Sequence, residues 1–425
     1  MKPGSISGNF QNFFGSYPEL LFVLFWGFVY CLSLHPDAPW GDGLGYAISV
    51  QKGYDLAVNA NSHFAYLNFF ALLKKLTGAT DALFLLRYGS VFWACISLWM
   101  TSRIGFLLSG SRQTGVLCLQ MLASCFACWR LACIPEVYAM ELAFFSMGLF
   151  FFLDWFQTGR VSRFCLFALI HAIGLLVHIH LILMFVLYPL AWIMRRKDFF
   201  FPALLSYLLP ISVFFASVQI LGINSWSQIL FENQQQQLLS FGWRRLLYGP
   251  FFSTAILLYM MPGVLWIPYL IKNVRISWQN PLLQTGILLF LSFFLFACLY
   301  PDPGSFVFLL PAFMLMALGF SLLVQDGAPR LKRWIVLMPV FQTAFYILLF
   351  FGLPLFAPQA WLQTQKIKGG PGFVSLPWAR GNAASVADLT RTLPADSIPE
   401  GMRWNARQVA VLDSIRLLNK KAESR

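Results

Sequence analysis

Few side chains in this sequence could do acid–base chemistry, and most of them lie at the ends of apolar runs. Only 17 of the 425 residues are acidic, and five are histidine. Asp42, in the stretch WGDGLGY, follows the first apolar run, and Glu136 lies in a short turn between two later runs. His63 lies in the first long loop, and His178 and His180 lie in another turn. A carboxylate at such a place could act as a general base, and imidazoles could hydrogen-bond a polar substrate.

The apolar runs have the length that membrane-spanning helices need. The chain is 58% hydrophobic and 11% charged, whereas about a quarter of the residues of a soluble domain are charged. Apolar runs of about 20 residues recur along the chain, as spanning helices require. We expect about eleven spans, near residues 18–34, 82–102, 114–133, 137–155, 163–179, 181–194, 200–222, 250–271, 281–299, 304–324 and 333–356. The composition therefore predicts an all-α polytopic membrane protein.

Basic residues fall on alternate turns between these runs. They are Arg103 with Arg112, Arg160 with Arg163, Arg195 to Lys197, Lys272 with Arg275, and Arg330 with Lys332 and Arg333. The positive-inside rule places these turns and the N-terminus in the cytoplasm. Anionic head groups account for the net charge of +13, so we expect the lipid bilayer, and no nucleic acid, as the partner of this charge. The acids and histidines would then converge at the extracytoplasmic membrane surface.

Two segments outside the spans have patterns of their own. In the first loop, over residues 35–81, the apolar residues from Phe64 to Leu76, with Lys74 and Lys75, predict a helix that lies in the membrane interface. After residue 356 the chain is rich in Gly and Pro, and then helical near residues 403–418. We expect a transmembrane domain over residues 1–356 and a short extracytoplasmic tail over residues 357–425.

Position alone also allows structural roles for three candidates. Asp42 could cap a helix that begins at Leu44. Glu136 could suit the dipole of the helix that begins after Pro135. His63 could be a surface residue of the helix in the loop. Both kinds of role stay open at this point.

Two further pairs of residues are ambiguous in the same way. His178 and His180 would point nearly opposite ways on an ideal helix, so a shared metal would require the helix to break there. Arg244 and Arg245, in WRRLLYG, lie on the extracytoplasmic side, against the positive-inside trend. Paired arginines beside aromatic residues suit a phosphate group at head-group level, or simple anchoring in the interface.

Four motifs in the first half of the chain occur in a familiar order. They are WGDGLGY after the first span, SHFAYLNFFALLKKL in the loop, PEVYAMELAF at the start of a later span, and GLLVHIHLILMF around the paired histidines. Together they resemble the first-loop Asp motif, the interfacial helix, the "EVY" span start and the His motif of the GT-C superfamily of polytopic glycosyltransferases. In particular, the chain is similar to bacterial proteins related to the protein O-mannosyltransferases. The match covers about residues 20–190. The second half of the chain shares only the general pattern of apolar runs and none of the four motifs.

The resemblance implies a fold, a location and a reaction. The fold is a GT-C-like bundle whose long first external loop carries interfacial helices, in a bacterial inner membrane with an extracytoplasmic active site. The reaction is an inverting sugar transfer from a polyprenyl-phosphate donor to an extracytoplasmic acceptor, either a protein hydroxyl or an envelope glycan or lipid. Asp42 is the expected general base, and Glu136 orients the acceptor or the histidines. The expected substrate-binding residues are His63, Tyr66, Tyr138, His178, His180, Arg244 and Arg245.

The sequence gives no support for a cofactor. Many relatives carry a second acid beside the loop aspartate, but here Gly43 and Leu44 follow Asp42. A divalent metal therefore lacks the paired-acid motif that would hold it. Cys125 and Cys128 form a CxxC with no second pair and no nearby His, so we expect them to pack in the core.

Two other functions fit a polytopic chain. A polysaccharide polymerase or ligase that uses lipid-diphosphate glycans would rely on external arginines more than on a first-loop aspartate. A transporter or flippase would carry polar or broken helices near the bilayer midplane, and often internal repeats. The sequence has no convincing repeat, and its ionisable residues gather at one surface, which favours the enzyme.

Overall fold

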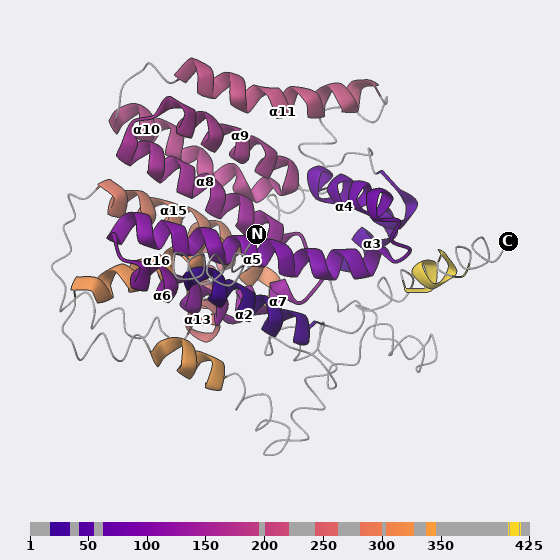
Figure 1. Cartoon of the computed structure of the whole chain (residues 1–425), viewed down its shortest axis with the longest axis horizontal. Coiled ribbons are helices and arrows are strands. Elements are labelled where there is room, and N and C mark those ends of the chain that lie inside the picture. The colour runs from indigo at the N-terminus through magenta and orange to yellow at the C-terminus, as the bar shows by residue number, and fades with distance from the viewer. Residues whose placement is uncertain are drawn as a thin grey trace, which may run out of the picture.

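The computed structural model of the chain is a bundle of helices (Figure 1). It describes residues 18–34, 42–54, 63–194, 200–220, 243–261, 281–299, 303–326, 337–345, 407, 409–415 and 417. Within these ranges every regular element is an α-helix or a 3₁₀ helix. The all-α fold class predicted from the apolar runs is therefore confirmed.

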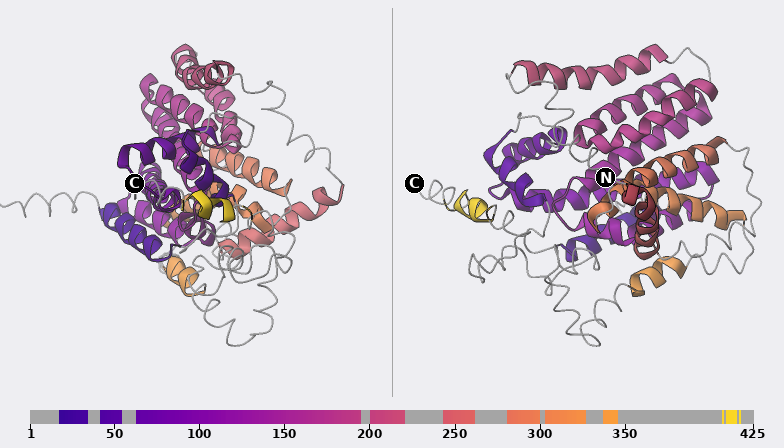
Figure 2. Two further views of the ribbon diagram at one scale, coloured as in Figure 1. Left: turned by 90° about the vertical axis from the view of Figure 1, so that its right-hand side faces the viewer. Right: turned by 180° about the vertical axis from the view of Figure 1, so that it is seen from behind.

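Three long helices form the centre of the bundle. α8 (Tyr138–Thr158) packs between α5 (Ala82–Ser109) and α9 (Val161–Val177). α5 and α8 have the length and composition of helices that cross a membrane. At 1.5 Å per residue they are roughly 42 and 32 Å long, enough to span the ~30 Å hydrocarbon core. α11 (Phe200–Ile220) packs against α9, and Figure 2 shows it along one edge of the bundle.

The outer helices show the pattern expected next to lipid. α2 (Pro18–Leu32) packs against α5 and α6 (Arg112–Ala123) through one face. Its opposite face is apolar but exposed, which is the reverse of a helix on a water-soluble protein. The exposed residues are Leu21, Leu24, Phe25, Phe28 and Leu32. These features identify an integral membrane protein.

The predicted span over residues 114–133 is not one continuous helix. α6 ends at Ala123, and α7 (Phe126–Ala132) continues at an angle of 71° to it. The break falls at Ser124 and Cys125, where Cys125 has extended backbone angles and the Ser124 hydroxyl donates back to the Gln120 carbonyl at 2.9 Å. The run predicted as one span therefore consists of two helices joined at a bend.

A second break separates the predicted spans over residues 163–179 and 181–194. α9 ends at Val177, and His178 is extended, with φ −154° and ψ 125°. The chain continues as a 3₁₀ helix, η1 (Ile179–Val186), before α10 (Leu187–Met194). A 3₁₀ stretch of this length is uncommon and often marks a functional site. The two histidines therefore do not lie on an ideal helix.

The two ends of the bundle carry different side chains. At one end, Arg103 of α5 lies 3.5 Å from Glu19 of α2, and Arg163 of α9 lies 3.0 Å from Asp154 of α8. The opposite ends of α8 and α9 carry Tyr138 and Val177, next to the turns that hold Glu136 and His178. Arg103 and Arg163 thus lie at the end of the central helices opposite the candidate site residues, as the positive-inside rule predicts for these turns.

The first loop forms a helical layer at the end of the bundle that holds the candidate residues. α3 (Gly43–Lys52) packs against α4 (Phe64–Thr77) and α5, and α4 also packs against α9. A side chain at Gly89 of α5 would overlap the ring of Phe70, so this glycine lets α4 approach closely. The predicted loop helix is confirmed, and its position in the membrane interface stays a prediction.

The second half of the chain adds helices around this centre. α13 (Trp243–Met260) packs against α15 (Pro281–Cys298) and η4 (Pro303–Leu309), which leads into α16 (Leu310–Asp326). Two helices of the described part are long and apolar enough to span, or three if α6 and α7 form one span. Several shorter apolar helices accompany them, so the count of about eleven stays a prediction. The expected boundary near residue 356 and most of the tail lie outside the described residues.

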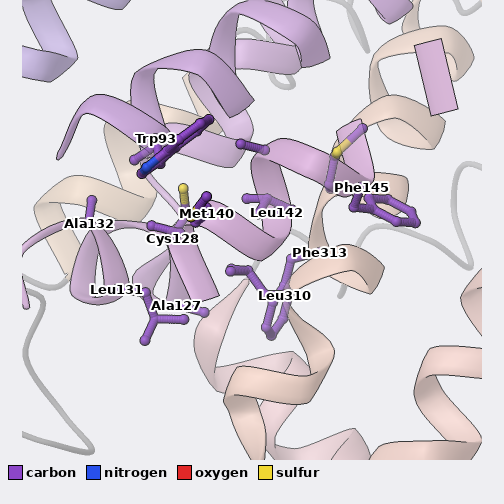
Figure 3. Packing of buried hydrophobic residues seen from close by; sticks show 14 of the residues in the cluster. Trp93, Ala127, Cys128, Leu131, Ala132, Met140, Leu142, Phe145, Leu310 and Phe313 are labelled. Atoms are coloured by element: carbon purple, nitrogen blue, oxygen red, sulfur yellow. The ribbon is translucent and has the colours of Figure 1, made fainter. Parts of the chain in front are cut away.

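The core is continuous across the two halves of the sequence. Figure 3 shows Cys128 and Leu131 of α7 with Met140, Leu142 and other side chains of α8, packed beside Leu310 and Phe313 of α16. Cys125 and Cys128 are fully buried here, and Cys125 donates to the Met260 carbonyl at 3.4 Å. The prediction that these cysteines are small core residues is confirmed.

Candidate functional site

Glu136 caps the N-terminus of α3 from 94 residues away in the sequence. Its Oε1 accepts the backbone N–H of Asp42 at 3.1 Å, and the N–H of Gly43 also points to this carboxylate. The first N–H groups of a helix have no partner within the helix, and a carboxylate there satisfies them and suits the dipole. Glu136 also stands one residue before the N-cap of α8, so the role that the sequence suggested for it there stays open.

The side chain of Asp42 does not cap α3. It stands at the N-cap position of α3, yet its side chain makes no capping hydrogen bond, and it is exposed. The alternative role of Asp42 as the cap of this helix is therefore excluded, because the Glu136 carboxylate accepts these N–H groups. The Asp42 side chain is exposed, and its backbone N–H is held by Glu136.

Gly43 makes this arrangement possible. A Cβ atom on Gly43 would lie 2.5 Å from the carbonyl oxygen of Pro135 and 2.7 Å from its Cγ. Any larger residue would push α3 away from the turn that carries Glu136. The sequence shows Gly43 next to Asp42, but only the fold shows that this glycine allows two distant segments to meet.

Glu136 lies in the turn between α7 and α8 in an environment that disfavours its charge. It is buried, and its Oε2 has no hydrogen-bond partner among the described residues. Burial raises the pKa of the Glu136 carboxyl well above its usual value, and the charge of nearby Asp42 raises it further. The two backbone N–H donors act in the opposite direction. Two carboxyl groups with different environments therefore lie side by side, one exposed and one buried.

His63 is held in an unusual conformation at the start of α4. Its φ of 45° lies in the left-handed region, which among the described non-glycine residues is seen only here. Its Nδ1 lies 3.2 Å from the carbonyl oxygen of Val177, and its ring stacks on His178 at 5.0 Å. Burial lowers the pKa of His63 to about 4. His63 is thus a half-buried neutral imidazole in contact with the break after α9, not a surface residue of the loop helix.

Aromatic rings connect the loop to the two later motifs. Tyr46 of α3 meets the edges of His63 and Tyr66, with ring centroids 5.3 and 5.4 Å apart. On the other side, His178 lies 5.3 Å from the ring of Tyr138. The structure therefore brings together residues of all four motifs, including Tyr66 and Tyr138.

Glu141 is a member of this cluster that the sequence analysis did not select as a site residue. It is buried in the first turn of α8, and its Oε1 lies 2.6 Å from Nδ1 of His180. Its Oε2 lies 3.3 Å from Nδ1 of His178. An acidic residue inside an apolar span is itself a functional signal, and the segment PEVYAMELAF contains one. That signal could have identified Glu141.

Glu141, His178 and His180 are also of the types that bind metals. One ligand atom from each lies within 4.8 Å of the others, and the break after Val177 removes the objection that the histidines diverge. The present contacts are those of hydrogen bonds, however. The 2.6 Å separation of His180 and Glu141 is a short hydrogen bond, and His178 Nδ1 accepts the N–H of His180 at 3.2 Å. As arranged, Glu141 holds the ring of His180, and the backbone N–H of His180 holds the ring of His178.

Three of the predicted substrate-binding residues, His180, Arg244 and Arg245, are not seen at an open surface of the described part of the chain. His180 is buried among the rings of Phe293, Phe296 and Phe308, so it supports the site from behind rather than lining a surface. Arg244 and Arg245 fall in the first turn of α13, but their side chains lie outside the described part of the chain. Their role as phosphate ligands stays a prediction.

Comparison with known proteins identifies the fold. No family model matches the chain, and no curated protein matches it by sequence. ArnT from Cupriavidus metallidurans bound to undecaprenyl phosphate shares the fold, with a TM-score of 0.64 at 13% identity over 94% of this chain and 76% of that one. The apo structure of ArnT from Cupriavidus metallidurans gives a TM-score of 0.56, at 13% identity over 97% of this chain and 77% of that one. The chain therefore shares the fold of ArnT.

Proposed function

We propose that this protein transfers a sugar from a polyprenyl-phosphate donor to an acceptor hydroxyl at the extracytoplasmic membrane surface. One observation carries the proposal: Asp42 is an exposed carboxylate on a helix start that Glu136 holds in place from another segment. The Asp42 side chain is therefore exposed while its backbone is held in place, and the chain shares the fold of ArnT.

In the proposed reaction Asp42 is the general base. Its carboxylate takes the proton of the acceptor hydroxyl, and the acceptor oxygen attacks the anomeric carbon of the donor sugar. The bond from that carbon to the phosphate oxygen breaks on the opposite face. The polyprenyl phosphate leaves with the bonding electron pair, and the anomeric configuration inverts.

The lipid donor is supported by the structural neighbour. The ArnT structure holds undecaprenyl phosphate, which is a polyprenyl phosphate. In this chain, His63 and His178 form a stacked pair next to Tyr138, and such rings suit hydrogen bonding to a sugar or a phosphate. Arg244 and Arg245 are the proposed cationic partners of the leaving phosphate. The buried Glu136 fixes the base rather than acting as a second base.

The test replaces Asp42 by Asn and measures sugar transfer in membranes supplied with a radiolabelled polyprenyl-phosphate sugar. Loss of a general base lowers the rate by about 10²- to 10⁴-fold. We expect Asp42→Asn to fall in this range, with normal expression and unchanged thermal stability, because the side chain makes no capping bond.

Asp81→Asn is the matched control, since it makes the same chemical change in the same loop. Asp81 caps α5 by accepting the N–H of Leu83 at 2.9 Å, and Asn caps helices about as well as Asp. Asp81→Asn should therefore keep full transfer. Unchanged transfer by Asp42→Asn would end the assignment of the base.

A further inference from the structure

A basic cavity lies between the C-terminal ends of α3 and α4. Its volume is about 550 Å³, and residues 50–54 and 78–80, together with Ala71, Lys74 and Lys75, line it. Both helices end there in a glycine with positive φ, Gly53 at 117° and Gly78 at 65°. A cavity of this size is large enough for a small polar head group.

The charge of this cavity is positive. Lys52, Lys74 and Lys75 line it, and none of its described lining residues is acidic. Each helix end contributes about −0.5 charge, so three ammonium groups and two helix ends sum to about +2. Asp81 follows the lining residue Thr80, but its carboxylate is engaged in capping α5.

The position of the cavity indicates the membrane surface. Gln51, at the end of α3, donates to the Thr80 carbonyl at 3.0 Å and accepts the N–H of Ala82 at 3.1 Å. Ala82 is the first residue of α5, a helix long and apolar enough to span. The cavity therefore lies where a spanning helix leaves the bilayer. Leu72 and Leu76 of α4 are exposed beside it, as expected for side chains that reach the acyl region.

The cavity is separate from the candidate catalytic site. Asp42 and Glu136 meet at the first residue of α3, whereas the cavity is at its last residues. A helix of ten residues is roughly 15 Å long. A group bound in the cavity would not touch Asp42, and its recognition does not depend on the glycosyl transfer proposed above.

We propose that this cavity binds the phosphate of an anionic phospholipid head group. A phosphate monoester or diester carries the one or two negative charges that complement the cavity, and each ammonium group can donate three hydrogen bonds. Tyr54 supports the arrangement, because its ring lies 5.9 Å from Nζ of Lys75 and keeps that side chain at the rim. Lysines also suit helix C-termini, but this role leaves their donors available to a ligand.

The experiment measures lipid binding to the delipidated full-length protein in detergent, by native mass spectrometry. The probes are dioleoylphosphatidylglycerol, dioleoylphosphatidylcholine and inorganic phosphate. Juxtamembrane lysines each add measurably to the attraction of anionic lipid. We expect phosphatidylglycerol to bind roughly tenfold more tightly than phosphatidylcholine, and the variant K52Q/K74Q/K75Q to lose this preference.

The control removes the same charge elsewhere. R112Q/R160Q/R407Q changes three exposed cations that do not line the cavity and should keep the preference. If the triple lysine variant fails to fold, Lys74→Gln alone should still weaken phosphatidylglycerol binding by a few-fold. Equal binding of both lipids, or an unchanged triple lysine variant, would overturn the proposal. Displacement of the lipid by an equal concentration of inorganic phosphate would overturn the lipid assignment.

Discussion

Glu136 and Glu141 lie five residues apart, and each holds a different part of the candidate site. Glu136 accepts N–H groups at the start of α3 and so fixes Asp42. Glu141 contacts His178 and His180 and so fixes the break between α9 and η1. The two carboxyl groups flank the start of α8 and join three segments that are distant in the sequence. The geometry of the site therefore depends on buried acids that need not touch a substrate.

Replacing Glu141 by Leu tests the second of these roles. The change leaves the buried Nδ1 of His180 without its partner, which costs about 1–3 kcal/mol. We expect Glu141→Leu to lower the apparent midpoint of thermal unfolding in detergent and to reduce sugar transfer. Glu141→Gln keeps one hydrogen bond and should be intermediate in both measurements.

Asp154→Asn on the same helix is the matched control. Asp154 pairs with Arg163 at 3.0 Å near the opposite end of α8, and half-exposed pairs of this kind contribute about 0–1 kcal/mol. The unfolding midpoint and the rate of sugar transfer of Asp154→Asn should stay close to those of the unchanged protein. If Glu141→Leu were as stable and as active as Asp154→Asn, Glu141 would not stabilise the break between α9 and η1.

At the scale of the residue, the sequence indicated which side chains gather but not what each one does. Asp42, Glu136, His63 and His178 were expected to meet because they share one end of the spans, and they do. The capping of α3 by Glu136 could not be predicted, because it depends on how closely two segments 94 residues apart approach. Only the folded backbone sets that distance.

At the scale of the element, the contact between α3 and the Pro135 turn depends on one glycine. Gly43→Ala would place a methyl group 2.5 Å from the Pro135 carbonyl oxygen, a position that no relaxed structure allows. Overpacking of this kind costs about 1–3 kcal/mol. We expect Gly43→Ala to lower the apparent unfolding midpoint, and to lower sugar transfer because Asp42 moves with α3.

Gly286→Ala in α15 separates this effect from the general effect of adding a methyl group to a helix. No atom lies within 4 Å of the position of its Cβ, and alanine favours a helix over glycine by up to about 1 kcal/mol. Gly286→Ala should therefore be neutral or stabilising. If Gly43→Ala behaved in the same way, the close packing of α3 on Pro135 would be refuted.

Hydrophobicity predicted most helices but not the breaks within them. The run over residues 114–133 is apolar throughout, yet it bends by 71° at Ser124 and Cys125. The break at His178 likewise falls inside a continuous apolar stretch. A run of apolar residues indicates burial in lipid or protein. It does not indicate which single residue within the run has an extended backbone.

At the scale of the whole molecule, the basic turns and the candidate catalytic carboxyl groups lie at different ends. Arg103 and Arg163 lie near the ends of α5 and α8 that are linked by a 3.1 Å hydrogen bond from Gln157 to the Leu107 carbonyl. The candidate catalytic carboxyl groups and the basic cavity lie at the other end. The sequence predicted this separation because basic turns alternate along the chain, a signal that does not depend on the exact helix ends.

This separation predicts which side of the membrane each end faces. Alkaline phosphatase is active only outside the cytoplasm, and green fluorescent protein secreted in unfolded form fluoresces only inside it. We expect a phosphatase fused after Gly78 to be active, because this residue lies in the first loop beside the cavity. A phosphatase fused after Gly159, between α8 and α9, should be inactive, and the fluorescent fusion there should be bright. The reverse pattern would place Asp42 in the cytoplasm. It would then exclude an extracytoplasmic acceptor while leaving the fold and the contacts of the site unchanged.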